Sequence, residues 1–314
     1  MSATTASRSV TPDPAFPDWE HDGADWPNRS ASRFIKAGSI RFHVQILGQG
    51  PTMLLLHGTG AATHSWRDLA PLLAAHFTVI APDLPGHGFT EPLPWSRMSL
   101  PGMAGAVASL LGALGHDPPA LVIGHSAGAA IAVEMALDGM IAPLGIVSLN
   151  GALRRFKGVA GQIFSPLAKL MSLNPLVPRL FAWHAADPMV IGRLLNGTGS
   201  HIDQRGAELY GRLARRSGHA GAALSMMANW DLDRVEADLP RLTPRLLLVT
   251  GAEDRSIPPS DAALLARRMA TAKHVRLPGL GHLAHEEQPA MIAAMIVEFA
   301  QTLGVLKANH DERD

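Results

Sequence analysis

Residues 120–137, ALVIGHSAGAAIAVEMAL, decide the fold class of this chain. The opening ALVI is a short apolar run typical of a buried strand, and the small apolar residues after Ser126 are typical of a buried helix. Between them, Gly124, Ser126 and Gly128 form the pattern Gly-x-Ser-x-Gly, which is typical of a serine on a sharp turn between a strand and a helix. The stretch therefore predicts a strand, a nucleophile turn and a helix in succession.

Strand-like and helix-like segments alternate on both sides of this stretch. The predicted strands cover residues 40–47, 52–58, 77–83, 120–126, 144–151, 244–251 and 273–279. The predicted helices of the same region cover residues 65–76, 100–115, 127–138, 260–270 and 289–303. Most of these strands are apolar throughout, which indicates a mostly parallel sheet covered by helices on both faces, the α/β class.

The alternation stops between residues 152 and 230. This region holds helix-like stretches, among them residues 165–173, 188–195 and 206–216, without a convincing strand. We interpret 152–230 as a helical lid inserted in a core formed by residues 33–151 and 231–306. Residues 1–32 are rich in Ser, Thr, Pro and Asp and are predicted to be a mobile tail, which aromatic residues could attach in part to the body, and 307–314 form a short C-terminal tail.

Composition excludes several classes of function. Of 314 residues, 47% are hydrophobic and 17% charged, which fits a globular protein with a large core. The 27 basic and 27 acidic residues give no net charge, so nucleic-acid binding is not expected. The absence of cysteine excludes disulfides and a cysteine nucleophile. The N-terminus lacks a secretory signal, and the polar residues within 120–137 argue against a membrane span, so a cytoplasmic location is expected.

A serine hydroxyl needs a base and an orienting acid to act as a nucleophile. His282, in the loop PGLGHLAHEEQP after a short strand, is the predicted base for Ser126. Asp254, three residues past Gly251 at the end of another strand, is the predicted acid, with Glu253 as the alternative. The chain order serine, acid, histidine is the order of the α/β-hydrolase fold. The N–H groups of Thr59 and Ala127 are the predicted oxyanion donors, since they follow strand ends.

Other patterns point to no cofactor and no metal. His282, His285 and Glu286 do not form H-E-x-x-H, and residues 58–60 lack the third glycine of a dinucleotide loop. His57 is interpreted as structural, bonded to backbone. In the predicted lid, large side chains pack on the body, and some of them are expected to line an apolar substrate pocket. The predicted pocket residues are Phe156, Phe181, Trp183, Met226, Met227 and Trp230.

Five blocks resemble α/β-hydrolases of the esterase, haloperoxidase and C–C hydrolase kind. They are HGTGAATHSW, APDLPGHGFT, GHSAGA, GAEDRSIP and GHLAHEEQP, and the resemblance covers about residues 33 to 305. It implies the α/β-hydrolase fold and the triad of Ser126, Asp254 and His282. Haloalkane dehalogenases and epoxide hydrolases of this fold carry aspartate at the position of Ser126, so neither of these activities is expected.

A narrower resemblance lies in the segments where such hydrolases usually diverge. WPNRSASRFIKAG, LLLHGTGAATHSWRDLAPLL, SLNGAL, FSPLAKLMSLNPLVPRLFAW, NGTGS and MMANWDL are similar to bacteriochlorophyll-pathway hydrolases called magnesium chelatase accessory proteins. The resemblance implies a role in making bacteriochlorophyll, with a tetrapyrrole intermediate or a related ester as substrate and a location at or near photosynthetic membranes. It leaves open a non-catalytic alternative, in which the chain binds a porphyrin or magnesium chelatase subunits.

Overall fold

A mixed eight-stranded sheet organises the computed structural model, which describes residues 15–155, 174 and 176–307. The strands are β1 (Ser32–Ala37), β2 (Ile40–Leu47), β3 (Thr52–Leu56), β4 (Thr78–Pro82), β5 (Leu121–His125), β6 (Gly145–Leu149), β7 (Arg245–Gly251) and β8 (Ala272–Leu277). Their order is β1-β2-β4-β3-β5-β6-β7-β8, in which β2 is antiparallel to its two neighbours and all other pairs are parallel. The predicted α/β class is confirmed.

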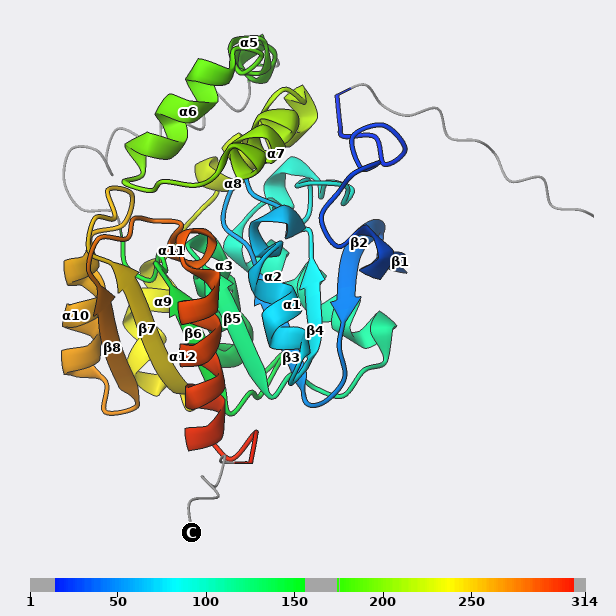
Figure 1. The fold of residues 1–314 in the computed structure, drawn as a ribbon. Coiled ribbons are helices and arrows are strands. Elements are labelled where there is room, and N and C mark those ends of the chain that lie inside the picture. The colour runs from blue at the N-terminus through cyan, green and yellow to red at the C-terminus, as the bar shows by residue number, and fades with distance from the viewer. Residues whose placement is uncertain (1–14, 156–173, 175, 308–314) are drawn as a thin grey trace, which may run out of the picture.

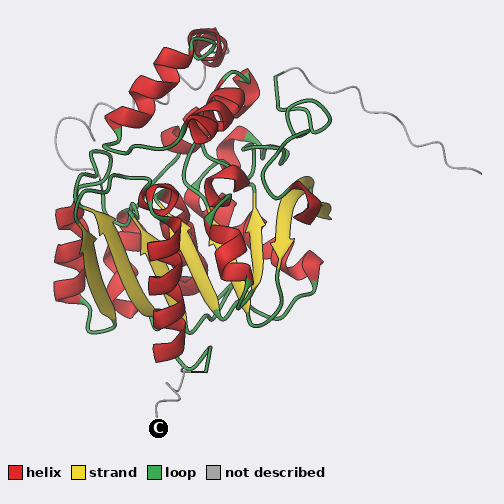
Figure 2. Ribbon diagram, in the orientation of Figure 1, coloured by secondary structure: helices red, strands yellow, loops and turns green. Residues whose placement is uncertain are grey.

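Helices cover both faces of the sheet (Figures 1 and 2). The core helices are α1 (Leu69–Ala74), α2 (Leu100–Leu114), α3 (Ala127–Leu137), α9 (Asp233–Asp238), α10 (Pro259–Arg268), α11 (Ala284–Glu287) and α12 (Pro289–Thr302). Helices α1 and α12 pack on one face, and α2, α3, α9 and α10 pack on the other. Side chains alternate between the two faces of the sheet along a strand. On β3, Leu54 packs in the layer of α2 and α3, and Leu55 packs in the layer of α1 and α12.

Strand β1 is a correction to the sequence analysis, which predicted no strand over residues 32–37. It pairs with β2 in a tight hairpin, with Ala37 opposite Ile40. Gly38 has φ 58°, a conformation that glycine adopts without steric cost. The strand was missed because it lies at the edge of the sheet and is mostly solvent-accessible, so it lacks the apolar run that marks the interior strands.

Residues 15–31 of the predicted mobile tail pack on the body, and an aromatic side chain attaches them as the sequence analysis allowed. Trp26 is buried, and its Nε1–H donates to Thr63 Oγ1 at 3.0 Å. Asp25 pairs with Arg212 at 2.6 Å, and hydrogen bonding to Arg212 lowers the pKa of this carboxyl group. This segment has no periodic pattern in its sequence. It is nevertheless ordered, because Trp26 and Asp25 bind partners that lie far away in the sequence.

Four further helices lie beyond the carboxyl edge of the sheet (Figure 1). They are α5 (Leu176–His184), α6 (Pro188–Gly197), α7 (Gln204–Ala214) and α8 (Ser217–Ala228). They fall within the predicted lid, while Phe156 and the predicted helix 165–173 lie outside the described residues. The division into lid and core stays a prediction.

Among the described residues, no helix combines the length and the apolar character needed to cross a bilayer.

Candidate active site

Ser126 sits between strand β5 and helix α3 in a backbone conformation that non-glycine residues rarely adopt. Its φ is 51° and its ψ is −116°. The Ser126 N–H donates to the carbonyl of Leu149 on β6 at 3.0 Å, so the neighbouring strand helps to hold the turn. Strain of this kind persists only where the surroundings impose it, and it is concentrated at functional sites. The serine is half-buried at the carboxyl edge of the sheet.

The two glycines of the motif permit the close packing that imposes this turn. A Cβ on Gly128 would lie 2.0 Å from the carbonyl oxygen of Leu56, and a Cβ on Gly124 would lie 2.4 Å from the backbone of Ala129. Any side chain at either position would push helix α3 away from strands β3 and β5. The Gly-x-Ser-x-Gly spacing is therefore a packing requirement as well as a turn signal.

Asp254 and His282 come together from the loops after β7 and β8. His282 Nδ1 lies 2.8 Å from Asp254 Oδ2, and both residues are buried. With Asp254 ionised, Nδ1 carries the hydrogen and Nε2 is left as the proton acceptor. The other carboxylate oxygen accepts the N–H groups of Ser256 and Ile257 at 2.7 and 2.9 Å, which fixes its orientation.

Asn150 is a residue of this site that the sequence analysis missed. Its Nδ2 donates to Asp254 Oδ2 at 2.7 Å and to the Gly281 carbonyl at 3.3 Å, so it ties the acid to the histidine loop. It follows β6 with φ 48°, which asparagine tolerates better than most residues. The position of an asparagine directly after a buried strand, in the segment SLNG, was the sequence feature that could have indicated a role in the site.

The loop after β3 adjoins Ser126. A Cβ on Gly58 would lie 3.1 Å from Ser126 Cβ, so Gly58 brings the backbone before Thr59 close to the serine. His57 Nδ1–H donates to the Gly58 carbonyl at 2.8 Å, and its Nε2 accepts the N–H of Leu84 at 2.9 Å. As predicted, His57 is structural and bonds backbone at this loop.

Residues 198–200, after α6, contact both the loop of Asp254 and the loop of His282. The N–H of Arg255 donates to the Thr198 carbonyl at 3.1 Å, next to Asp254. The N–H of Leu283 donates to Ser200 Oγ at 2.8 Å, next to His282. This segment of the predicted lid therefore connects the acid loop to the histidine loop. The sequence analysis assigned it no role.

Two buried histidines adjoin His282. The ring centroid of His125 lies 4.8 Å from that of His282 and 4.4 Å from that of His285, and His125 Nε2–H donates to the His282 carbonyl at 3.0 Å. Burial lowers the pKa of His125 and lowers that of His285 to about 3. Both rings are therefore neutral near pH 7, and a positive charge on His282 would meet no cationic neighbour in this pair.

Glu286, four residues past His282, joins the histidine loop to α7. Its buried carboxylate accepts Ser65 Oγ–H and Tyr210 O–H, each at 2.7 Å, and pairs with Arg67. Burial raises the pKa of Glu286, while Arg67 opposes that shift. Tyr210 lies on α7, so this network fixes one end of the predicted lid to the core.

Helix α8 contacts the loop after β3. His219 Nε2–H donates to the Gly60 carbonyl and Nδ1 accepts the Gly88 N–H, both at 3.1 Å. Met226 Sδ lies 3.6 Å from Thr59 Oγ1. Burial lowers the pKa of His219 to about 4.

The low pKa of His219 predicts a loss of stability in acid. An unfolded histidine takes up a proton near pH 6.5, whereas folded His219 does so only near pH 4, so the free energy of unfolding falls as the pH drops below 6.5. At about 1.4 kcal/mol per pH unit, this one residue costs about 2 kcal/mol between pH 7 and pH 5. In urea titrations at both pH values, His219→Gln is expected to reduce the loss of stability by the His219 share of about 2 kcal/mol, while buried His125 and His285 keep their own contributions. The exposed-site variant His116→Gln is expected to show the full wild-type loss. Equal pH dependence in the wild type and His219→Gln would contradict this assignment.

The predicted pocket residues differ in how far they are buried. Met226 is buried beside Thr59, and Trp230 packs partly buried against the core layer of α2 and α3. Phe181, Trp183 and Met227 are exposed, so the structure places them on the surface and not in an enclosed pocket. Phe156 lies outside the described residues.

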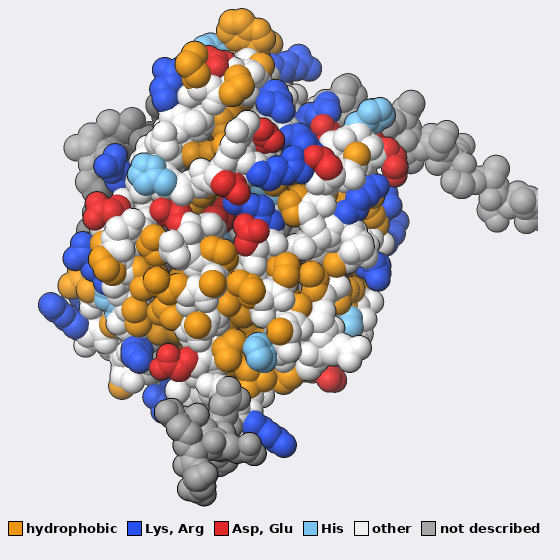
Figure 3. Space-filling view, viewed as in Figure 1, with side chains coloured by type: hydrophobic (Ala, Val, Ile, Leu, Met, Phe, Trp, Pro, Cys, Tyr) orange, Lys and Arg blue, Asp and Glu red, His pale blue; other side chains and the backbone are white. Residues whose placement is uncertain are grey.

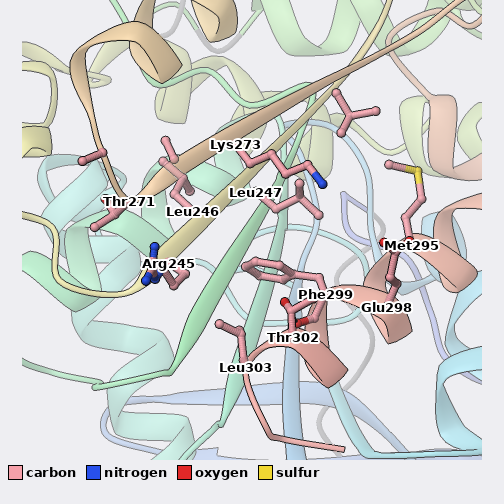
Figure 4. A pocket seen from close by; sticks show the side chains of 13 residues that line it. Arg245, Leu246, Leu247, Thr271, Lys273, Met295, Glu298, Phe299, Thr302 and Leu303 are labelled. Carbon is pink, nitrogen blue, oxygen red and sulfur yellow. The ribbon is translucent and has the colours of Figure 1, made fainter. Parts of the chain in front are cut away.

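A pocket lies elsewhere, between β7, β8 and α12 (Figure 4). Arg245, Thr271 and Phe299 are among the residues that line it. Arg245 begins β7, so this pocket opens at the amino edge of the sheet, opposite Ser126. Among the described residues, no group of three His, Asp or Glu side chains is placed to hold a metal ion.

Comparison with known proteins gives a family match and several relatives. Residues 53–295 match the Alpha/beta hydrolase family. The chain is 39% identical over 280 residues to the Magnesium-chelatase 30 kDa subunit of Rhodobacter capsulatus, covering 88% of this chain and 97% of that protein. It is 26% identical to 2-hydroxy-6-oxo-6-phenylhexa-2,4-dienoate hydrolase of Burkholderia cepacia, over 83% of this chain and 91% of the relative.

A solved structure shares the fold. The thermophilic esterase of Thermogutta terrifontis matches with a TM-score of 0.69 and 24% identity, over 87% of this chain and 98% of the esterase.

Proposed function

The chain belongs to the alpha/beta hydrolase family, and from this premise we propose that it is a serine hydrolase that cleaves an ester through an acyl-enzyme. The observation that carries the proposal is the buried contact of 2.8 Å between Asp254 and His282. The acid is held by three further hydrogen bonds, and the pair belongs to the sheet edge that presents Ser126 in a strained turn. This combination supports an activated serine.

In the proposed reaction, Ser126 Oγ attacks the acyl carbon while His282 Nε2 takes the hydroxyl proton. The negative charge that develops on the acyl oxygen is bound by the N–H groups of Thr59 and Ala127. His282 then gives its proton to the leaving alcohol, and the acyl group stays on Ser126. A water molecule, deprotonated by His282, releases the acid and restores the serine.

The proposed substrate is an ester of a tetrapyrrole intermediate, or a related ester, in bacteriochlorophyll biosynthesis. The name of the Rhodobacter capsulatus relative supports the pathway, because that protein is called a magnesium-chelatase subunit. The protein would act in the cytoplasm, peripherally at photosynthetic membranes.

Two assays on the wild-type protein test the catalytic proposal. A fluorophosphonate probe is expected to attach covalently in a one-to-one ratio, measured by intact mass. A panel of aryl esters and tetrapyrrole esters is expected to include at least one that is hydrolysed. Folded protein that neither takes up the probe nor hydrolyses any ester would contradict a working triad.

A second candidate function is supported by the name of the same relative. In it, the chain is a non-catalytic accessory that binds a porphyrin or magnesium chelatase subunits. Biolayer interferometry can measure whether the purified protein binds the chelatase subunits of Rhodobacter capsulatus. Binding there, together with no reaction in the two assays above, would favour this role.

A further inference from the structure

The outer face of helix α5 is apolar and exposed. Leu176, Leu180 and Trp183 are 57%, 60% and 71% exposed, and their spacing of four and three residues puts them on one side of the helix. On the other side, Pro178 and Ala182 are buried, with Pro178 beside Gly221 of α8. The exposed side is therefore not a face that the described residues use for packing.

Helix α6, at the same outer end of the molecule, exposes two further large apolar side chains. Met189 and Leu194 are 69% and 50% exposed. Figure 3 shows hydrophobic side chains at the outer end of the molecule, where Figure 1 places α5 and α6. We call Leu176, Leu180, Trp183, Met189 and Leu194 the cap patch. Soluble proteins rarely leave large apolar side chains grouped in this way unless the surface binds something.

Arginines accompany the cap patch. Arg179 lies three residues after Leu176 and four before Trp183, so it shares their side of α5. Arg193 is exposed on α6, and its Nε donates to the Met189 carbonyl of its own helix at 3.2 Å. Among the described residues, neither arginine pairs with a carboxylate. The acid of this region, Asp187, is occupied at the start of α6, where it accepts the Met189 N–H at 2.9 Å.

Apolar and cationic side chains together favour a lipid surface as the partner of the cap patch. Leucine and methionine gain by leaving water, tryptophan prefers the boundary between apolar and aqueous phases, and arginine reaches phosphate while its carbon chain stays in the apolar layer. Exposed apolar residues with cations beside them are typical of helices that lie in the surface of an anionic bilayer.

We propose that the cap patch docks on an anionic lipid surface, with the outer face of α5 lying in the headgroup region. The benefit of such docking rests on the proposed function, because it would bring an ester substrate to the active site. The patch lies beyond the carboxyl edge of the sheet, the edge that carries Ser126, so docking would hold that edge toward the lipid. An apolar ester dissolved in the bilayer would then reach the site without crossing bulk water.

Sedimentation of the full-length protein with lipid vesicles tests the proposal independently of catalysis. Wild-type protein is expected to bind vesicles containing phosphatidylglycerol more tightly than vesicles of pure phosphatidylcholine. Leu176→Ser/Leu180→Ser is expected to weaken binding at least about tenfold. Arg179→Glu/Arg193→Glu is expected to weaken binding to the anionic vesicles by about 25-fold or more, from about fivefold for each lost cation.

Leu72→Ser/Met291→Ser is the matched control, because these side chains are 42% and 46% exposed on α1 and α12, away from the cap. It is expected to bind like the wild type, and all variants are expected to keep the wild-type melting temperature. No binding of wild-type protein to anionic vesicles would overturn the proposal, as would an equal loss in the control. A concentration-dependent dimer that Leu176→Ser/Leu180→Ser dissociates would also overturn it, and would assign the patch to a second copy of the chain.

Discussion

Ser126→Ala is expected to lower kcat for any ester that the wild type hydrolyses by about a million-fold and to abolish fluorophosphonate labelling. The reason is chemical: alanine has no oxygen to form the acyl-enzyme, so only the slow direct attack of water remains. Because residue 126 has a φ of 51°, a substitution there can also change the stability of the fold. The melting temperature is therefore measured alongside activity.

Ser225→Ala provides the control for this variant. Ser225 is half-buried like Ser126 but lies in regular helix on α8, and no histidine or carboxylate among the described residues hydrogen-bonds its hydroxyl. The control is expected to be labelled at the wild-type rate. Labelling that persists in folded Ser126→Ala would place the nucleophile elsewhere and remove the basis of the proposed mechanism.

Asp254→Asn is expected to lower kcat by about 10⁴-fold while leaving KM within a few-fold of its wild-type value. The carboxylate accepts four hydrogen bonds: from His282, from Asn150 and from the N–H groups of Ser256 and Ile257. An amide can accept only through its oxygen. If that oxygen stays with the two backbone N–H groups, the NH₂ faces His282 and forces Nδ1 to be the acceptor, which leaves a hydrogen on Nε2 where the base is needed.

Glu253→Gln separates the two acids that the sequence leaves open. Glu253 is exposed, next to buried Asp254. Steady-state kinetics of this variant are expected to stay within about twofold of the wild type, as is usual for surface changes. A large loss in Glu253→Gln together with a small one in Asp254→Asn would reassign the acid.

Strong local signals in this chain corresponded to real elements. The interior strands are apolar because both faces of a parallel sheet are covered, so their positions could be predicted from the sequence. Strand β1, at the edge, carries no such signal. It exists because β2 offers a pairing partner, and β2 itself is antiparallel to both neighbours.

The candidate site divides in the same way. Ser126, Asp254 and His282 each follow a strand, and the carboxyl ends of parallel strands meet at one edge, so sequence order and spacing were enough to nominate them. The roles of Asn150 and Ser200 were not predictable, because each acts through a hydrogen bond to a loop more than eighty residues away. The exposure of Trp183 was not predictable either, because a large apolar residue on an amphipathic helix has the same sequence pattern whether its side of the helix faces the core or the solvent.

The sequence by itself determined the α/β class, the sharp turn at Ser126 and the chain order of the candidate triad, since these depend on periodicity and on steric rules that act over a few residues. Only the tertiary structure decided where residues 15–31 pack on the body, that residues 198–200 contact the loops of both Asp254 and His282, and that the outer face of α5 is left exposed. Those outcomes depend on which surfaces meet after folding, and no local pattern encodes the partner that a side chain finds at long range.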